Sequence, residues 1–584
     1  MEVLILSNLE EMMVFKPSRE YVAECPEYIK PGKTVLKKGW QVEAGSMPIP
    51  CDIVAEKDVP VKMRDGVTLY VDVFRPATED KVPVLISWSP YGKDNNTRAT
   101  YKNLFNMIGI PDSKLSGLQK FEGSDPAYWC NHGYAVCNPD ARGITKSEGN
   151  IYMIGSHEAQ DGYDLIEWLA EQSWCNGKVA LSGTSYLAFS QWFIASEQPP
   201  HLAAINPEEG LSDAYRDLVS RGGITDVGFT QRIQINHVHA GEPVQAEDVA
   251  AEGLKYPFAN HPVWQDKIAK PEKITCPVYV VASYSNTLHT MGTFRAWRAI
   301  PTGQKWLRIH DAQEWPDFYT AEHIEDRRKF FDHFLKGINN GWESTPIVRY
   351  SLHDFEGGNI TGIPAEAFPP VETQYRKLYL NAKSQLLENV MPEAESSVKY
   401  NSEGVLTLAS FLFTASERTE IIGYPKVKLW VEAEGHDDMD VYISLYKLDK
   451  NGNLLQQFVI PNRCARNHDL TDRGGSILRY RGSTGRLRVS MRHLDEEKST
   501  DVIPYHSFDR FEKLKAGEIV PIEIAMYPTG IILYAGEQLR LVISATDEAG
   551  SMMPGTEPQK PNNKGRHVIH CGGIYDSYLQ LPLK

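Results

Sequence analysis

The segment 178–188, Lys-Val-Ala-Leu-Ser-Gly-Thr-Ser-Tyr-Leu-Ala, places a serine between two kinds of apolar sequence. The run 179–181 suits a short buried strand, and residues 186–195 suit a helix. A serine on so sharp a strand-to-helix turn stands clear of the backbone, beside the N–H groups of the helix N-terminus. The pattern predicts Ser185 as a nucleophile. The alternative is an ordinary turn, since Leu187 replaces the second glycine of the common Gly-x-Ser-x-Gly pattern.

Apolar runs of strand length recur between about residues 52 and 350, and helix-like stretches such as 162–170 separate several of them. Continuous apolar runs are typical of strands covered on both faces, and alternation with helices is typical of a parallel, doubly wound sheet. The sequence therefore predicts the α/β class, with an α/β-hydrolase sheet whose functional groups gather at the C-terminal ends of its strands. The predicted strands are 84–88, 134–137, 179–181, 202–205, 278–282 and 306–309.

Two interruptions of this rhythm, about 95–128 and 211–270, are longer than ordinary loops and contain helix-like stretches. We interpret them as helical cap inserts over the functional edge of a domain at 55–365. Residues 1–54 are then an N-terminal extension.

The sequence pattern changes after about residue 365, where the helix-like periodicity ends. Strands of alternating apolar and polar residues are separated by turn-rich pieces, which is typical of an antiparallel sandwich. The sequence predicts an all-β jelly-roll domain at 366–584, joined by a linker near 364–370. The clearest strands are 427–434, 441–446, 487–490 and 539–544.

Charge and composition exclude several classes of function. The net charge of −15 argues against a general binder of nucleic acid or of anionic membranes, and 42% hydrophobic residues suits a globular protein. No apolar run reaches the ~20 residues of a membrane helix, and the N-terminus lacks the pattern of a signal peptide, which predicts a cytoplasmic protein. No phosphate-binding loop or dinucleotide motif is present, so no cofactor is expected. His237 and His239 have no evident third ligand, so no metal site is expected either.

Longer motifs extend the pattern in order along the chain. The N-terminal part contains 65–76 (Asp-Gly-Val-Thr-Leu-Tyr-Val-Asp-Val-Phe-Arg-Pro), 82–94 (with Ser-Pro-Tyr-Gly) and 133–143 (with Pro-Asp-Ala-Arg-Gly). The C-terminal part contains 419–425, 487–492 and 536–541. From about residue 55 onward the chain resembles the CocE/NonD family, the cocaine-esterase-like hydrolases related to X-Pro dipeptidyl-peptidases.

The resemblance implies an α/β-hydrolase domain, a helical cap and a jelly roll, with acyl transfer through a serine. It implies Ser185 as the nucleophile. It also implies that the Tyr91 hydroxyl and the backbone N–H of Tyr186 form the oxyanion hole. Trp192, on the helix after the serine, is predicted to line the substrate site.

The acid and the base depart from the family pattern. The family's aspartate position, after the strand 278–282, holds serine or Asn286, which can orient an imidazole but cannot neutralise it. The family's histidine position holds a glutamate. We predict His310, at the end of the strand 306–309, as the base, with His289 as the second candidate. Glu209, after the strand 202–205, is the candidate replacement acid, and Asn286 is its alternative.

These residues predict a serine hydrolase or acyl transferase acting on an ester or amide of a small molecule, without nucleic-acid or membrane partners. A homodimer is expected on general grounds. The alternative is non-hydrolytic chemistry, such as isomerisation, cyclisation or a retro-aldol step, on a re-used hydrolase scaffold. A third reading is a binding protein without catalysis.

Overall fold

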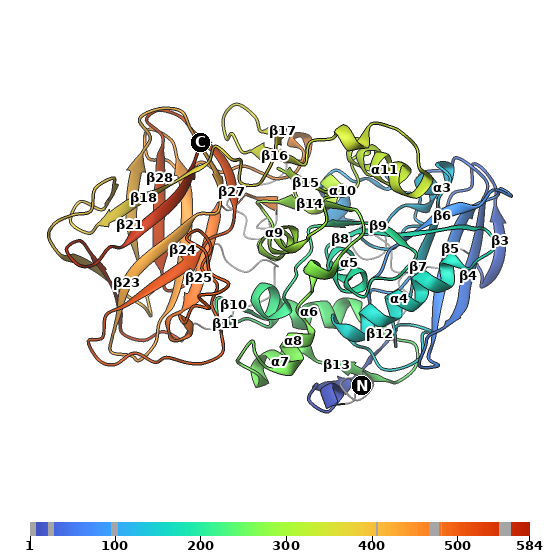
Figure 1. The fold of residues 1–584 in the computed structure, drawn as a ribbon, viewed down its shortest axis with the longest axis horizontal. Helices are drawn as coiled ribbons and strands as arrows, with labels where there is room; N and C mark the ends of the chain where they lie inside the picture. The colour runs from blue at the N-terminus through green and yellow to red at the C-terminus, as the bar shows by residue number, and fades with distance from the viewer. Residues whose placement is uncertain are drawn as a thin grey trace.

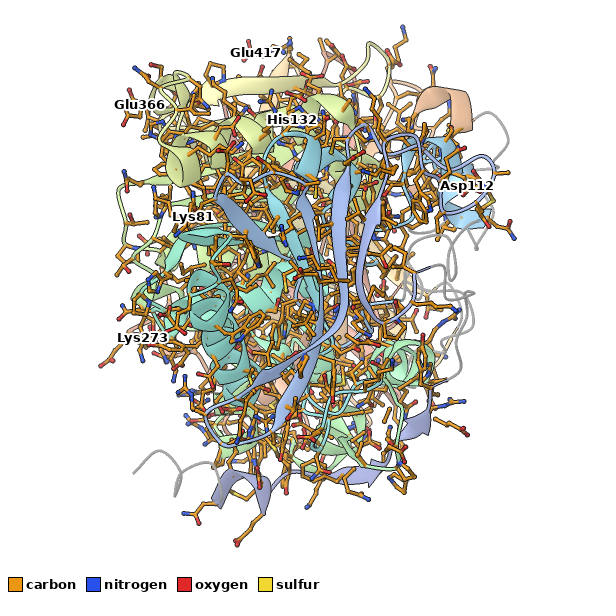
Figure 2. The ribbon with its side chains drawn as sticks, turned by 90° about the vertical axis from the view of Figure 1, so that its right-hand side faces the viewer. Lys81, Asp112, His132, Lys273, Glu366 and Glu417 are labelled. Atoms are coloured by element: carbon orange, nitrogen blue, oxygen red, sulfur yellow. The ribbon has the colours of Figure 1, made fainter. Side chains whose placement is uncertain are left out.

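A computed structural model describes residues 8–21, 29–94, 103–404, 407–465, 478–480, 482–547 and 562–584. The N-terminal two thirds of the chain form a mixed sheet with helices, and the C-terminal third forms an all-β part beside it (Figure 1). The predicted fold class is therefore confirmed in both parts. In a view turned by 90°, the strands β3 (Gly32–Leu36) and β4 (Ile53–Lys62) form the near edge of the sheet (Figure 2). Exposed charged side chains such as Lys81 and Lys273 lie at the outline of this view.

Within the described part of the chain, the main sheet has eleven strands in the order β17-β16-β15-β14-β9-β8-β6-β7-β5-β4-β3. From β7 to β16 every neighbouring pair is parallel, and the strands at both edges pair antiparallel. Each apolar run predicted in this part falls on one of the parallel strands. The remaining strands are β5 (Thr68–Pro76), β6 (Val82–Ile86), β7 (Ala135–Pro139), β8 (Cys175–Thr184), β9 (Leu202–Glu208), β14 (Val278–Ser283), β15 (Lys305–His310), β16 (Val348–Leu352) and β17 (Ile360–Ala365).

Helices cover this sheet, and α5 (Tyr186–Ser196) is the most enclosed of those described here. All of its residues are buried, because it packs against β8 and β9 on one side and α4 (Ser156–Ala170) on the other. A helix that is apolar around its whole circumference has no solvent face to offer. The other helices around the sheet are α3 (Pro126–Asn131), α9 (Thr290–Ala299), α10 (Glu314–Phe318), α11 (Ala321–Lys336) and the short 3₁₀ turn η4 (Trp342–Ser344).

The insert between β9 and β14 is only partly helical. Short strands within it pair with the start of the chain: β13 (Gln245–Glu247) with β1 (Phe15–Pro17), and β12 (His239–Ala240) with β2 (Arg19–Glu20). The first predicted insert, 95–128, lies in part outside the described residues, and its described part holds η1 (Asp112–Lys114) and the start of α3. The second insert also contains η2 (Ala214–Val219), β10 (Ser220–Arg221), β11 (Ile224–Thr225), α6 (Gly228–His237), α7 (Val249–Lys255), α8 (Pro262–Asp266) and, just beyond it, η3 (Pro271–Lys273).

The described residues of the C-terminal part form a thirteen-stranded all-β assembly. Its strands alternate buried and partly exposed residues, as in β23 (Lys426–Glu434). This alternation suits a sheet with one face in a core. Its other elements are β18 (Gln374–Asn381), β19 (Leu386–Glu388), β20 (Ser396–Asn401), β21 (Leu408–Thr414), β22 (Thr419–Gly423), β24 (Asp440–Leu448), α12 (Asn462–Ala465), β25 (Ser483–Arg488), η6 (Val489–Met491), β26 (Val520–Ala525), β27 (Thr529–Leu533), β28 (Gln538–Ser544), β29 (Arg566–Cys571) and β30 (Tyr578–Leu583).

The two parts touch through specific hydrogen bonds. The Tyr527 hydroxyl donates to the carbonyl of Thr287 at 2.5 Å, and Arg216 donates to the carbonyl of His506 at 3.0 Å. Gly530 fits against Tyr284, because a Cβ at position 530 would lie 2.7 Å from that ring. Among the described residues no helix has the length and apolar character needed to cross a membrane.

Candidate active site

Ser185 is the single residue between β8 and α5, and its backbone is strained. Its φ of 60° and ψ of −122° lie in a region that costs a non-glycine residue about 1–3 kcal/mol. The surrounding backbone holds it there, since the Ser185 N–H donates to Glu208 at 3.1 Å and its carbonyl accepts from Ala188 at 2.9 Å. Gly183 is required for this turn, because a Cβ there would lie 2.4 Å from Leu187 Cβ. The predicted sharp turn is therefore present.

The structure brings His289 to Ser185. His289 Nε2 lies 3.1 Å from Ser185 Oγ, and the ring comes from the residue directly before α9, in the connection that follows β14. Burial lowers the pKa of His289 to about 3, so the imidazole is neutral at pH 7. Its Nδ1 is buried and has no hydrogen-bond partner among the described residues.

Glu314, the first residue of α10, approaches the same imidazole nitrogen that faces Ser185. Its Oε2 is 3.9 Å from His289 Nε2 and accepts a hydrogen bond from the Asn286 side-chain amide. Burial, together with the nearby carboxyl groups of Glu209 and Glu122, raises the pKa of Glu314 well above its ordinary value. The Asn286 Oδ1 accepts a hydrogen bond from the His289 backbone N–H at 3.2 Å. Asn286 therefore fixes the backbone of His289 and does not bond its imidazole ring.

Glu122 is a second buried carboxyl at this turn and is not among the residues predicted from the sequence. Its Oε1 accepts from the Trp315 indole at 2.8 Å, and its backbone carbonyl accepts from Thr184 at 3.2 Å. Burial raises the pKa of Glu122 to about 8, and the neighbouring Trp315 indole and Ser185 hydroxyl offset this only in part. No pattern marks Glu122, because the residues directly around it form neither a helix nor a strand and carry no catalytic motif.

His310 and Glu209 form the predicted pair, with 2.6 Å between His310 Nε2 and Glu209 Oε1. The other ring nitrogen lies 3.5 Å from Asp317, which also accepts two hydrogen bonds from Arg308, at 2.9 and 2.5 Å. Burial lowers the pKa of His310, but Asp317 and Glu209 outweigh it and raise that pKa overall. Among the described contacts none joins His310 to Ser185. The histidine that the structure places at the serine is His289.

The predicted oxyanion donors lie beside the turn. Tyr91 is buried just after β6, and its ring packs edge-on against Tyr186 with 5.5 Å between centroids. The Tyr186 N–H belongs to the first residue of α5, where a helix offers no internal partner. The Tyr186 hydroxyl is used elsewhere and donates to Glu158 at 2.6 Å. Trp192 is fully buried in the core on α5.

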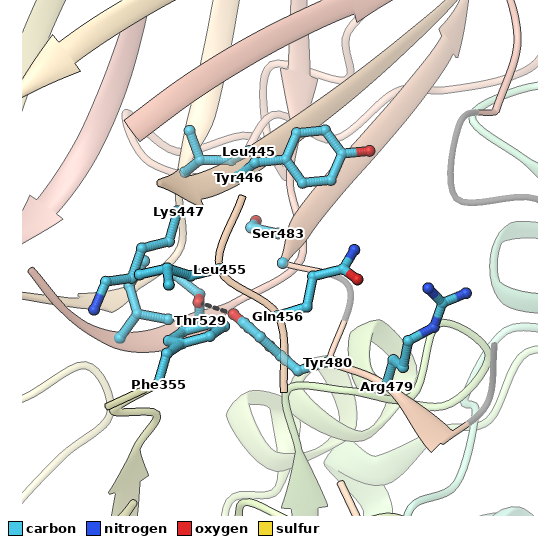
Figure 3. A pocket seen from close by; sticks show the side chains of 12 residues that line it. Phe355, Leu445, Tyr446, Lys447, Leu455, Gln456, Arg479, Tyr480, Ser483 and Thr529 are labelled. Carbon is cyan, nitrogen blue, oxygen red and sulfur yellow. Dashed lines mark hydrogen bonds between the residues drawn. The ribbon is translucent and has the colours of Figure 1, made fainter. Parts of the chain in front are cut away.

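A cavity of about 600 Å³ lies next to the His310–Asp317 pair, between the α/β part and the all-β part. It is lined from one side by Asp317 and His323 and from the other by Gln457 and Val459. A smaller cavity of about 100 Å³ lies within the all-β part, where the hydroxyl groups of Tyr480 and Thr529 are hydrogen-bonded to each other (Figure 3).

Among the described residues no group of three or more His, Cys, Asp or Glu side chains could hold a metal ion. The side chain of His237 lies outside the described part. His239 bonds the carbonyl of Ile235.

Comparison with known proteins places this geometry in a family. Residues 65–313 match the model of the X-Pro dipeptidyl-peptidase S15 family, and residues 340–580 match the model of the X-Pro dipeptidyl-peptidase C-terminal non-catalytic domain. A CocE/NonD family hydrolase from Staphylococcus aureus is 34% identical, with 95% of this chain and 97% of that chain covered and a TM-score of 0.86. The chain belongs to the CocE/NonD family. The predicted resemblance is confirmed.

Two curated relatives share shorter segments with this CocE/NonD chain. Cocaine esterase of Rhodococcus sp. is 35% identical over 159 residues, 27% of this chain and 24% of that protein. Xaa-Pro dipeptidyl-peptidase of Streptococcus gordonii is 27% identical over 202 residues, 27% of this chain and 26% of that protein. The chain therefore spans about a quarter of the length of each of these two relatives. Together the matches show a hydrolase enzyme of the esterase and peptidase type.

Proposed function

We propose that this CocE/NonD hydrolase cleaves an ester or amide of a small molecule, with Ser185 as the nucleophile and His289 as its base. The observation that carries the proposal is the 3.1 Å approach of Ser185 Oγ to His289 Nε2 on a strained strand-to-helix turn. A nucleophile and base within hydrogen-bond reach are the core of serine catalysis.

In the first step the Ser185 hydroxyl proton passes to His289 Nε2 as Oγ attacks the substrate carbonyl carbon. The carbonyl oxygen becomes an oxyanion beside the Tyr91 hydroxyl and the Tyr186 N–H, and one such donor contributes ~3 kcal/mol of transition-state stabilisation. Since the Tyr186 N–H has no partner inside α5, it is available to a substrate oxygen.

Glu314 is the acid of this arrangement. Its Oε2, 3.9 Å from His289 Nε2, approaches the nitrogen that becomes charged when the serine loses its proton. Because the free imidazole has a pKa lowered to about 3 by burial, the imidazolium needs a nearby negative charge to form. Burial and the neighbouring carboxyl groups raise the pKa of Glu314, so its carboxyl is protonated at neutral pH and supplies that charge only at a pH where it has ionised. The adjacent His310–Glu209 pair holds a proton of its own. In this proposal His310 is not the base that takes the Ser185 proton.

The proposal is tested with a fluorophosphonate probe followed by intact-mass measurement. The wild type is expected to gain one adduct, Ser185→Ala none, and His289→Gln an adduct formed at least 100-fold more slowly. His310→Gln is the matched control, since it changes a buried histidine that has no described contact with Ser185, and it should label within about tenfold of the wild-type rate. Absence of an adduct on folded wild-type protein, or an adduct that persists in Ser185→Ala, would contradict the assignment.

A further inference from the structure

The two oxygens of the Glu122 carboxyl have different surroundings. Oε1 accepts from the Trp315 indole at 2.8 Å. Oε2 is buried and has no hydrogen-bond partner among the described residues. The Ser185 hydroxyl nevertheless lies close enough to stabilise the charged carboxylate. A buried carboxyl oxygen without a partner therefore sits beside the nucleophile.

The position of Glu122 is fixed from two elements. Its carbonyl accepts the N–H of Thr184, the last residue of β8, so its backbone is tied to the residue before the nucleophile. Its side chain is tied to Trp315 on α10, next to Glu314. Its φ of 64° is unusual for a glutamate, which points to a conformation that the surroundings impose. The carboxyl is held at the turn rather than free to swing away.

We propose that Glu122 is a catalytic general acid, which protonates the leaving group that Ser185 displaces. This proposal rests on the function proposed above. His289 and Glu122 divide the two proton transfers of each half-reaction between them, so that neither has to serve both the serine and the leaving group.

The protons balance over a turnover. In acylation the Ser185 proton moves to His289, the bond from carbonyl carbon to leaving group breaks, and the leaving oxygen or nitrogen takes the Glu122 proton. The acyl-enzyme then holds a protonated His289 and an ionised Glu122. In deacylation water attacks the acyl carbon and gives a proton to Glu122, and His289 returns its proton to Ser185 Oγ as the acyl bond breaks. The products are an acid and an alcohol or amine.

The electrostatic surroundings suit an acid. The carboxyl groups of Glu314 on α10 and Glu209 after β9 lie in the same buried region, where His289 and His310 can become positive. The Arg308 guanidinium, paired with Asp317 beside His310, is a further positive charge there. Burial raises the pKa of Glu122 to about 8, so it is protonated at neutral pH and ionises as the pH rises through that value. The proposed acid function is present below about pH 8 and lost above it.

The test compares leaving groups in Glu122→Gln, using 4-nitrophenyl butyrate and ethyl butyrate as probes. Nitrophenolate leaves without a proton, whereas ethoxide does not. General acid catalysis contributes about 10²–10⁴-fold. Glu122→Gln is expected to lose at least 100-fold in turnover of the ethyl ester, to keep the nitrophenol burst within about fivefold, and then to deacylate slowly. Equal losses with both esters, or no loss with the ethyl ester, would overturn the proposal.

Glu252→Gln is the matched control, because Glu252 on α7 is another buried glutamate whose pKa is raised to about 8, chiefly by burial. It should keep both activities within about twofold. If Glu122→Gln does not fold, the wild-type pH profile decides: ethyl ester turnover must fall above about pH 8 while the nitrophenol burst does not. A wild type that neither labels with fluorophosphonate nor releases nitrophenol would refute the proposed function. Normal labelling without leaving-group dependence would refute the role of Glu122 alone.

Discussion

At the residue scale, the turn at Ser185 depends on the absence of a side chain two positions earlier. Gly183 has a φ of 155°, and a Cβ there would come within 2.4 Å of Leu187 Cβ. Leu187 occupies the place where many hydrolases of this fold have glycine, so the close approach is relieved at position 183 instead. The strained backbone of Ser185 and the missing side chain at Gly183 therefore belong to the same turn, and each depends on the other.

Gly183→Ala is therefore expected to lower both stability and reactivity. Overpacking of a tight core typically costs about 1–3 kcal/mol, and here it falls directly on the turn. Urea unfolding should give a lower midpoint, and fluorophosphonate labelling should slow at least tenfold. Gly303→Ala is the control, since a Cβ at position 303 meets nothing within 4 Å. A variant at position 183 that labels at the wild-type rate would contradict this account.

The sequence predicts a residue of the candidate site only where a recognisable motif marks that residue. Ser185 follows a recognisable strand-and-turn pattern, and Glu209 and His310 were expected to meet because both end strands that lie at one edge of the sheet. Glu122 has no such marker. Glu314 has no such marker either, because its approach to His289 depends on how α10 packs, which the local sequence does not encode.

At the element scale, the connection from β15 into α10 is held by a buried ion pair. Arg308 on β15 donates two hydrogen bonds to Asp317 on α10, and His323 contacts the same carboxylate at 2.9 Å. Burial raises the pKa of Asp317, but Arg308 and the two histidines overcome this and hold it well below its ordinary value. Because α10 also carries Glu314 and Trp315, this pair fixes the acidic side of the site.

Asp317→Asn is expected to destabilise the fold by about 3–5 kcal/mol at pH 7, since it leaves the Arg308 charge buried without its partner. A carboxyl with a depressed pKa contributes stability above its unfolded value, and that contribution is lost as the pH falls. The difference between variant and wild type should therefore shrink in urea unfolding at pH 3 relative to pH 7. The exposed Glu322→Gln serves as control. An equal difference at both pH values would exclude this explanation.

At the scale of the whole molecule, the all-β part supports the chain segment that bears His289. The Tyr527 hydroxyl donates to the carbonyl of Thr287, two residues before His289, and Arg221 of the insert donates to the same carbonyl at 3.4 Å. The C-terminal part thus does more than lie beside the sheet. It contacts the backbone that positions the proposed base.

Tyr527→Phe should therefore slow the chemistry without unfolding the protein. The loss of one such hydrogen bond costs about 1 kcal/mol, which corresponds to several-fold slower labelling of Ser185. Tyr534→Phe, which removes a hydroxyl bonded to Asp354 instead, is the matched control and should label normally. Equal labelling of both variants would show that the all-β part does not influence His289.

The insert over the sheet is fastened by the first residues of the chain, since Phe15–Pro17 and Arg19–Glu20 each add a strand to it. Its edges are therefore shared between segments more than 200 residues apart in sequence. The insert therefore does not move about a single hinge, because moving it away from the sheet would break the β1–β13 and β2–β12 pairings together. Residues 15–20 therefore hold the insert in place, and a variant without them would leave β12 and β13 without their partner strands.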